Sequence, residues 1–257
     1  MFRLEGPARS PRNNAILAGY LAFVAGFVNS GGFVLIGSFT SHVTGSVGRL
    51  SIDVTHGDFG AALFAALLAV TFFVGSLSAS LILQGPRPTR LPRAYGMALS
   101  LEGGLLAGFI FVAGLSQTSH LRLRDAEAAI LCAAMGMQNS LVPRLSGAVV
   151  RTTHLTGVIT DLGIETAQWL RWRVRLWRSR GAADVAAGRP AVHARATLLL
   201  TIATAFTLGG LLGATLTARI SRWAMLGPAC AVWGAALFAF SQRPSSAGGV
   251  RPSETDA

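Results

Sequence analysis

Six stretches of the chain are apolar enough and long enough to cross a lipid bilayer as helices. A bilayer core about 30 Å thick requires about 20 mostly apolar helical residues. The stretches that meet this requirement are Ala15–Ile36, Phe59–Leu83, Ala94–Leu115, Ala126–Val142, Ala196–Leu216 and Trp223–Phe240. In lipid each backbone polar group needs a partner within the chain, so these stretches predict an all-α membrane bundle.

The composition agrees with lipid rather than water as the solvent. Only 13% of the 257 residues are charged, and 51% are hydrophobic, whereas soluble domains typically carry about 25% charged residues. So little charge cannot cover a soluble globule of this size. The two cysteines, Cys132 and Cys230, lie in apolar stretches without metal-ligand spacing. We therefore expect no disulfide framework, no metal and no other cofactor.

The basic residues indicate how the chain is oriented in the membrane. The net charge is +11, and the chain contains arginine but no lysine. The arginines accompany no nucleic-acid-binding motif and lie between the apolar stretches, which favours the lipid bilayer as the partner and excludes nucleic acid. With six crossings, 17 of the 22 arginines share the side of both termini. The positive-inside rule then predicts that both termini lie on the cytoplasmic side of an inner (cytoplasmic) membrane.

Two further segments have helical character but are too polar for contact with lipid. They are Thr40–Val54 and Thr152–Leu170, and each contains a histidine and two other charged side chains. Such segments are tolerated in a membrane only when protein buries them or when they line a wet cavity. We interpret both as broken or half-helices. Whether they cross the membrane is left open, because eight crossings would still place 15 of 22 arginines on one side.

The polar segments belong to an internal repeat. Residues 26–45 and 136–157 both contain G-x-x-N-S, followed by a hydroxyl residue, His, an apolar residue, Thr and Gly. The matched pairs are Asn29 with Asn139, Ser30 with Ser140, His42 with His154, Thr44 with Thr156, Gly45 with Gly157, Arg49 with Asp161, and Asp53 with Glu165. The repeat predicts two membrane units, residues 14–116 and 125–241. Three crossings per unit is an odd number, so the second unit enters inverted, as in many secondary transporters.

The same motifs carry a family resemblance. The G-x-x-N-S and SHVTG residues, with the later RTTHLTGVITDLGIE, resemble the YoaK-like family of uncharacterised bacterial membrane proteins over about residues 14–241. The resemblance implies a six-helix membrane protein and supplies no activity or substrate. It also implies Asp–Ala or similar residues where this chain has Asn29–Ser30, so it gives no carboxylate role to position 29.

The candidate binding residues lie on one face of each polar segment. His42, Arg49 and Asp53 share one such face, and His154, Asp161 and Glu165 share the other. Arg49 and Asp53 can pair across one helical turn, whereas one of the two acids in the second segment must take a proton or find an arginine. Free N–H groups beside each Thr–Gly pair favour an anion or a carbonyl. The alternative is that these histidines and threonines only cap the broken helices.

Other polar residues inside the bundle have either a structural or a functional interpretation. Asn29, Ser30, Asn139 and Ser140 can supply hydrogen bonds between helices in both cases. Glu102 is the one acid deep inside an apolar crossing, where it acts either as a proton-binding group or as a buried structural acid. The glycine pairs Gly104/Gly108 and Gly209/Gly213 are predicted to be points of close helix packing.

The leading functional hypothesis is a small secondary transporter or channel-like carrier for a small polar solute or anion, and not an enzyme. We expect the two polar half-helices to meet and form its one central site. One alternative is a scaffold or sensor that uses a basic membrane-surface patch in the predicted cytoplasmic loop 171–195. That patch comprises Arg171, Arg173, Arg175, Arg178 and Arg180. The other is an intramembrane enzyme on a lipid substrate, with Asp161 and His154 as acid and base. Residues 1–13 are expected to be cytoplasmic, residues 242–257 disordered, and a homodimer is left open.

Overall fold

The computed structural model describes residues 11–84, 91–115, 121–146, 155–179 and 192–242, and within these ranges it is helical without any strand. The helices are α1 (Pro11–Ile36), α2 (Val43–Thr55), α3 (Phe59–Leu83), α4 (Leu91–Leu115), α5 (Leu121–Ser146), α6 (Leu155–Arg178), α8 (Val192–Ile220), the short 3₁₀ helix η4 (Ser221–Met225) and α9 (Leu226–Ser241). Each of the six apolar stretches and both polar segments therefore forms a helix. The terminal segments 1–10 and 243–257 lie outside the described residues.

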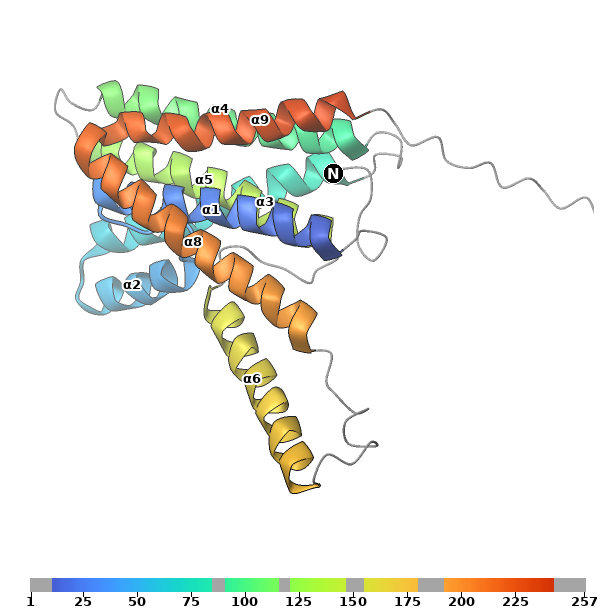
Figure 1. Ribbon diagram of the computed structural model, residues 1–257. Helices are drawn as coiled ribbons and strands as arrows, with labels where there is room; N and C mark the ends of the chain where they lie inside the picture. Colours follow the sequence, from blue (N-terminus) through green and yellow to red (C-terminus); the bar gives the residue numbers. More distant parts are fainter. Residues whose placement is uncertain (1–10, 85–90, 116–120, 147–154, 180–191, 243–257) are drawn as a thin grey trace, which may run out of the picture.

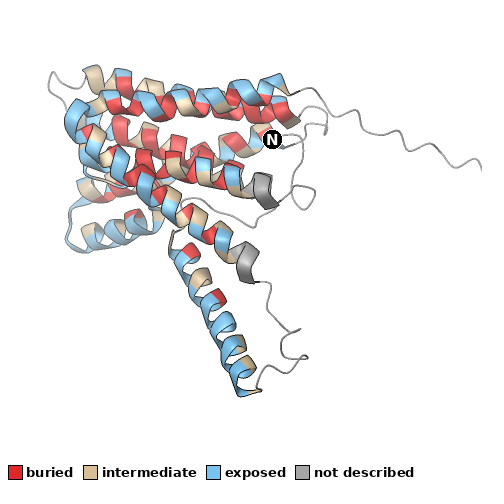
Figure 2. Ribbon diagram, viewed as in Figure 1, coloured by how far each residue is buried: buried red, intermediate tan, exposed pale blue. Residues whose placement is uncertain are grey.

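The long helices form one bundle. Helix α4 packs against α5 and α9, α5 also packs against α3, and α1 packs against α8. In Figure 1 the shorter helix α2 lies on one side of the bundle, and α6 leans away from it. Figure 2 shows buried residues concentrated on the inward faces of the long helices, while α6 is almost entirely exposed. The core therefore lies between α1, α4, α5, α8 and α9.

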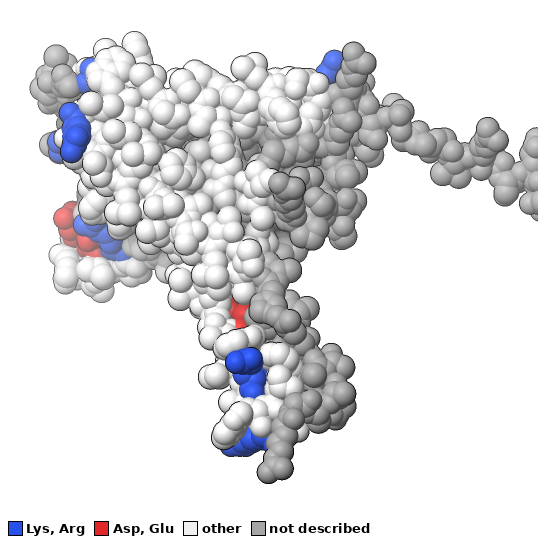
Figure 3. Space-filling view, viewed as in Figure 1, with Lys and Arg blue, Asp and Glu red and all other residues white. Residues whose placement is uncertain are grey.

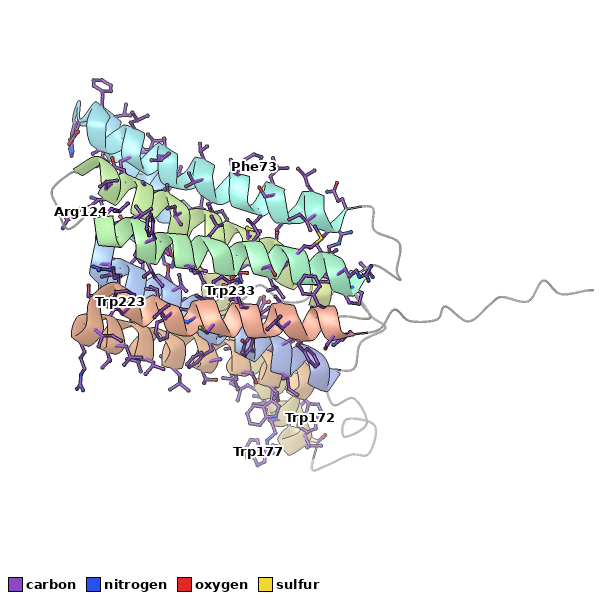
Figure 4. All side chains as sticks on the ribbon, turned by 90° about the horizontal axis from the view of Figure 1, so that it is seen from above. Phe73, Arg124, Trp172, Trp177, Trp223 and Trp233 are labelled. Atoms are coloured by element: carbon purple, nitrogen blue, oxygen red, sulfur yellow. The ribbon has the colours of Figure 1, made fainter. Side chains whose placement is uncertain are left out.

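The outer surface of this bundle is suited to lipid, and the chain is a membrane protein. Among the described residues, Ala15–Ile36, Phe59–Leu83, Leu91–Leu115 and Ala196–Ser241 are long and apolar enough to cross a membrane. Large apolar side chains point outward. One of them is Phe73, which is labelled in Figure 4 and has 64% of its surface exposed in the structure. Figure 3 shows a broad uncharged face, with charged residues gathered at the ends of the bundle and on α6.

Hydroxyl groups on the exposed helix faces form hydrogen bonds with carbonyl oxygens of their own helix. On α8, the hydroxyls of Thr201, Thr204, Thr207 and Thr215 each donate to the carbonyl oxygen four residues earlier, at 2.7–2.9 Å. This bond hides a polar group against the helix backbone, so the side chain presents a methyl group outward. The arrangement removes the cost of an unpaired hydroxyl in hydrocarbon.

Helix α5 differs from the other long helices because protein surrounds it. It contacts α1, α3 and α4, and Leu131, Ala134, Met135 and Leu141 are fully buried. The sequence of α5 is less hydropathic or more charged than those of the four membrane-span candidates, and α5 is not among them. A helix enclosed by other helices needs less apolar surface than one that faces lipid, because its neighbours and not lipid contact its side chains. This explains why the predicted stretch at Ala126–Val142 is short.

Two pairs of helices approach each other closely at glycines. At the α1–α8 crossing, a Cβ atom on Gly26 would overlap the carbonyl oxygen of Phe206, and one on Gly209 would overlap that of Phe23. The α3–α5 crossing repeats this arrangement, with Gly75 against the carbonyl of Ala133 and Gly136 against that of Phe72. In both crossings the contacted carbonyl lies three residues before the partner glycine. Gly26 and Gly136 are the first residues of the two G-x-x-N-S motifs.

One of the two predicted glycine pairs does not pack in this way. Gly213 contacts the backbone of Phe27, so Gly209/Gly213 is confirmed as a close-packing pair. A Cβ atom on Gly104 or Gly108 would have no neighbour within 4 Å, so the prediction for that pair is wrong. These two glycines lie on a face of α4 that no other described helix covers closely.

We expect substitutions at the crossing glycines to destabilise the fold selectively. Gly75→Ala and Gly136→Ala place a Cβ atom on a helix backbone that cannot move without separating α3 from α5, at a cost of about 1–3 kcal/mol. Gly104→Ala and Gly108→Ala are the matched controls, because they fill empty space and gain up to about 1 kcal/mol in helix propensity. Thermal unfolding in detergent, followed by size-exclusion chromatography, measures the difference. Equal stability of all four variants would contradict the proposed packing.

Candidate functional site

A cavity of about 480 Å³ lies between α2, α3 and the turn that joins α1 to α2. Its polar residues are Ser38, His42, Ser46, Arg49 and Asp53. Its apolar and backbone lining consists of Phe33, Ile36, Gly37, Phe39, Gly45, Ala61, Phe64, Ala65 and Leu68. Most of the polar residues come from the first polar segment, which the sequence singled out.

Asn29 holds the turn that creates this cavity. Helix α1 ends at Ile36. The next residue, Gly37, has a φ of +73°, and its N–H donates to the carbonyl of Phe33 at 2.8 Å. The chain then turns back, and the Asn29 side-chain oxygen accepts hydrogen bonds from the N–H groups of Thr40 and Ser41 at 3.2 Å and from the Ser41 hydroxyl at 3.0 Å. Asn29 is buried. An amide oxygen therefore replaces the helix bonds that the chain gives up when it breaks inside the bundle.

The turn leads into α2, where His42, Thr44 and Gly45 are exposed. His42 is the N-terminal cap residue of α2, but its side chain makes no capping hydrogen bond. The His42 ring lies 5.0 Å from the ring of Phe39, which in turn stacks on Phe33 at 4.4 Å. The cavity extends along α3 as far as Leu68, nine residues or roughly 14 Å from the start of that helix. That depth is about half of a bilayer core.

One face of α2 presents polar groups to the cavity at helical spacing. His42, Ser46, Arg49 and Asp53 line it, while Thr44 is exposed and does not. The Ser46 hydroxyl donates to the His42 carbonyl at 3.4 Å. No ion pair joins Arg49 to Asp53, although we predicted that they could pair. Both charges are therefore available to a ligand in the cavity.

The second polar segment forms α6 and is placed differently. The G-x-x-N-S motif that precedes this segment lies within α5 and remains helical. There the Asn139 amide donates to the Met135 carbonyl at 3.1 Å, and the Ser140 hydroxyl donates to the Met137 carbonyl at 3.0 Å. Thr156 and Gly157 are exposed in the first turn of α6. His154 lies outside the described residues.

The two acids of this segment both have partners. Glu165 is buried and Asp161 half-buried, and each takes part in a polar interaction. Helix α6 packs against α8, whereas α2 packs against α3. Figure 4 shows α3 at one edge of the bundle and the α6 residues Trp172 and Trp177 near the opposite edge. We had expected α2 and α6 to form one shared pocket. Their described parts do not, because they pack on different helices.

The basic patch continues α6 as a helix and does not start a loop. Arg171, Arg173, Arg175 and Arg178 are all exposed, and the Arg173 guanidinium lies 5.5 Å from the Trp169 ring centre. Arg180 lies outside the described residues. Arginine and leucine favour helices, and the apolar residues Leu170, Val174 and Trp177 follow one another at helical spacing. The predicted cytoplasmic loop 171–195 is therefore helical as far as Arg178, and residues 180–191 lie outside the described residues.

Glu102 lies at the centre of the bundle without a hydrogen bond. It is fully buried in the middle of α4, and neither carboxyl oxygen has a hydrogen-bond partner. Helices α3 and α9, which pack against α4, carry no charged residue, whereas α5 and η4 do. No ion pair involves Glu102 within the described ranges. An ionised carboxylate without a counter-charge would cost several kcal/mol in such surroundings, so the site accommodates the neutral acid.

Two polar residues of the bundle, the exposed Tyr20 and the buried Gln138, were missed by the sequence reasoning. The Tyr20 hydroxyl donates to the Ala231 carbonyl at 2.5 Å and lies within electrostatic range of Glu102. The Gln138 amide donates to the Leu21 carbonyl at 3.0 Å, which leaves the buried side-chain oxygen of Gln138 unpaired. Gln138 stands inside the second G-x-x-N-S motif, where the first has Val28. That difference between the copies is the signal that could have identified it.

The family of the chain follows from a comparison that covers almost all of these elements. Residues 17–239 match the model of a family described as protein of unknown function, DUF1275. The chain belongs to the DUF1275 family. This membership agrees with the resemblance to the uncharacterised YoaK-like proteins. No curated protein and no solved structure matches the chain at a significant level. For this DUF1275 member, the geometry of the chain itself must therefore supply the functional argument.

We expect Asn29 to be required for the position of α2. Asn29→Leu keeps the side-chain size but leaves the buried N–H groups of Thr40 and Ser41 unsatisfied, at about 1–3 kcal/mol each. Asn29→Asp is the matched control, because it retains an oxygen acceptor. In a chain with both cysteines replaced by alanine, maleimide labelling of Ser46→Cys should become faster with Asn29→Leu only. Equal labelling rates in both backgrounds would show that the turn does not depend on this acceptor.

Proposed function

We propose that the chain is a small carrier in the bacterial inner membrane that moves a small polar solute or anion. The observation that supports this proposal is the cavity beside α2, which combines His42, Arg49 and Asp53 with the N-terminal end of a short helix. Charged residues within a membrane bundle are costly and usually mark solute or ion pathways. Secondary transporters form their binding sites from broken helices of this kind.

The charges of the cavity favour a particular class of solute. The Arg49 guanidinium and the free N–H groups at the start of α2 both attract a carboxylate or another small anion. Asp53, four residues from Arg49 on the same helix face, can hold a positive group at the other end of the solute. We therefore propose a small anion or a small zwitterion such as an amino acid.

We further propose that six helices cross the membrane in two inverted units. The packing of α1 on α8 has its counterpart in α5 on α3, and that of α2 on α3 has its counterpart in α6 on α8. The reciprocal glycine contacts of the two crossings support the same correspondence. Because α2 and α6 pack on different helices, the proposed binding site is the cavity beside α2 alone. Helix α6 supplies a second polar surface of the opposite unit.

Glu102 is proposed as the proton-binding group that couples this carrier to a proton gradient. A buried acid without a counter-charge can accept and release a proton only when its surroundings change, as they do in alternating access. Tyr20 of α1 lies within electrostatic range of Glu102. The scaffold or sensor alternative would use the exposed arginines of α6, and the enzyme alternative would need His154 near Asp161.

The orientation is tested by cysteine labelling from one side of the membrane. In a background without native cysteines, Arg49→Cys should react with a membrane-impermeant maleimide added to intact spheroplasts. Arg171→Cys should react only after the membrane is permeabilised, because six crossings place residues 49 and 171 on opposite sides. Both positions are exposed, so each serves as the control for the reactivity of the other. Labelling of both from the same side would exclude the six-crossing arrangement.

The carrier function is tested by flux into proteoliposomes. Chloride, acetate, phosphate and glycine are offered in turn, and uptake is measured with and without a pH gradient. We expect Arg49→Gln to reduce uptake of the transported solute by about tenfold or more, because a charge-assisted hydrogen bond contributes about 1.5–3 kcal/mol. Arg124→Gln is the matched control, since Arg124 is exposed and does not line the cavity.

The role of Glu102 is separated from that of the cavity in the same assay. Glu102→Gln keeps the side-chain size and should abolish the stimulation by the pH gradient while solute exchange continues. Uptake of none of the four solutes, or equal uptake by the Arg49 and Arg124 variants, would contradict the proposed site. A Glu102→Gln variant that still responds to the gradient would remove the coupling proposal and leave the cavity in place.

A further inference from the structure

A second cavity, of about 370 Å³, lies where α4, η4 and α9 meet at one end of the bundle. Its apolar lining consists of Ala107, Ile110, Phe111, Gly114, Leu115, Trp223 and Leu226, and Arg222 is its one charged residue. Phe111, Leu115 and Leu226 are exposed on the outer surface of the bundle. Figure 4 shows Trp223 and Arg124 at this same end. The cavity is therefore an apolar groove that opens toward lipid and has a cation at its membrane-surface end.

A sharp turn of the chain places that cation. Ser221, which joins α8 to η4, has a φ of +53°, and among the described residues it is the one non-glycine residue with a positive φ. Such a backbone costs about 1 kcal/mol or more and persists only where the surroundings require it. The turn brings Arg222 over the last turn of α4, where a Cβ atom on Gly114 would be 3.7 Å from the guanidinium.

Among the residues that the structure describes, no anion is a partner of Arg222. Its guanidinium lies 5.1 Å from the ring centre of Trp223, and its Nε is buried without a hydrogen bond. No ion pair involves Arg222 within the described ranges. A guanidinium that is partly removed from water and lacks a carboxylate favours binding of an external anion. The donors on the free edge of Arg222 match phosphate oxygens in geometry.

We propose that this groove binds an anionic phospholipid, with its phosphate on Arg222 and an acyl chain along the α4–α9 groove. Tryptophan marks the depth of lipid headgroups in membranes, so Trp223 places the guanidinium at the level of the phosphates. Basic pockets between membrane helices are known to bind acidic headgroups. Arg219, one helical turn before Arg222, is exposed and does not line the groove. The inference does not depend on the proposed carrier function.

The test is native mass spectrometry of the full chain released from mixed micelles that contain phosphatidylglycerol or phosphatidylcholine. The wild type is expected to retain phosphatidylglycerol about tenfold more than phosphatidylcholine, and Arg222→Gln to lose most of this preference, as for one charge-assisted contact. Arg219→Gln is the matched control and should keep the preference. Arg222→Lys retains the charge and shows whether a variant that folds still discriminates between the lipids.

Three results would overturn the proposal. The first is a wild type that retains both lipids equally. The second is an equal loss of preference in the Arg219 and Arg222 variants, which would mean that surface charge alone attracts the lipid. The third is complete competition by millimolar inorganic phosphate, which would assign the site to a free anion. Reduced retention of both lipids by Ala107→Phe, which fills the groove without changing the charge, would support an acyl chain in it.

Discussion

The bundle depends on two places where helix backbones touch with no side chain between them. Gly26 and Gly209 allow α1 and α8 to meet, and Gly75 and Gly136 do the same for α3 and α5. Within a membrane, lipid tails solvate apolar side chains as well as protein does, so helix association relies on close packing. These crossings fix the distance between the long helices, and the remaining features of the structure are arranged around them.

The second constraint is that a chain in hydrocarbon must provide its own hydrogen-bond partners. The threonines of α8 meet it by bonding to their own helix. Asn29 meets it at the break between α1 and α2, where the backbone leaves the helical pattern. The first G-x-x-N-S motif therefore has a physical explanation: the glycine permits the helix crossing and the asparagine three residues later holds the turn. Glu102 departs from this rule, which is why we assign it a functional role.

The positions of the helices could be predicted because length and apolarity are local properties of the sequence. Phe59–Leu83 was predicted with the bounds that the structure gives it. Which helices pack against each other could be predicted less well from the sequence. The spacing of Gly104 and Gly108 is as suggestive as that of Gly209 and Gly213, yet only the second pair contacts another helix. Likewise, the repeated His–x–Thr–Gly residues suggested one shared pocket, but α2 and α6 pack on different helices.

The sequence by itself determined that the chain is a helical membrane protein, where its helices lie, and which polar residues stand at unfavourable depth. Those properties follow from the free energy of moving each segment from water into lipid, which depends on the segment alone. Only the tertiary structure decided that Asn29 holds a turn, that Arg49 and Asp53 face a cavity without pairing, and that Arg222 borders an apolar groove. These facts depend on which helices meet, and side chains far apart in the sequence decide that through their packing.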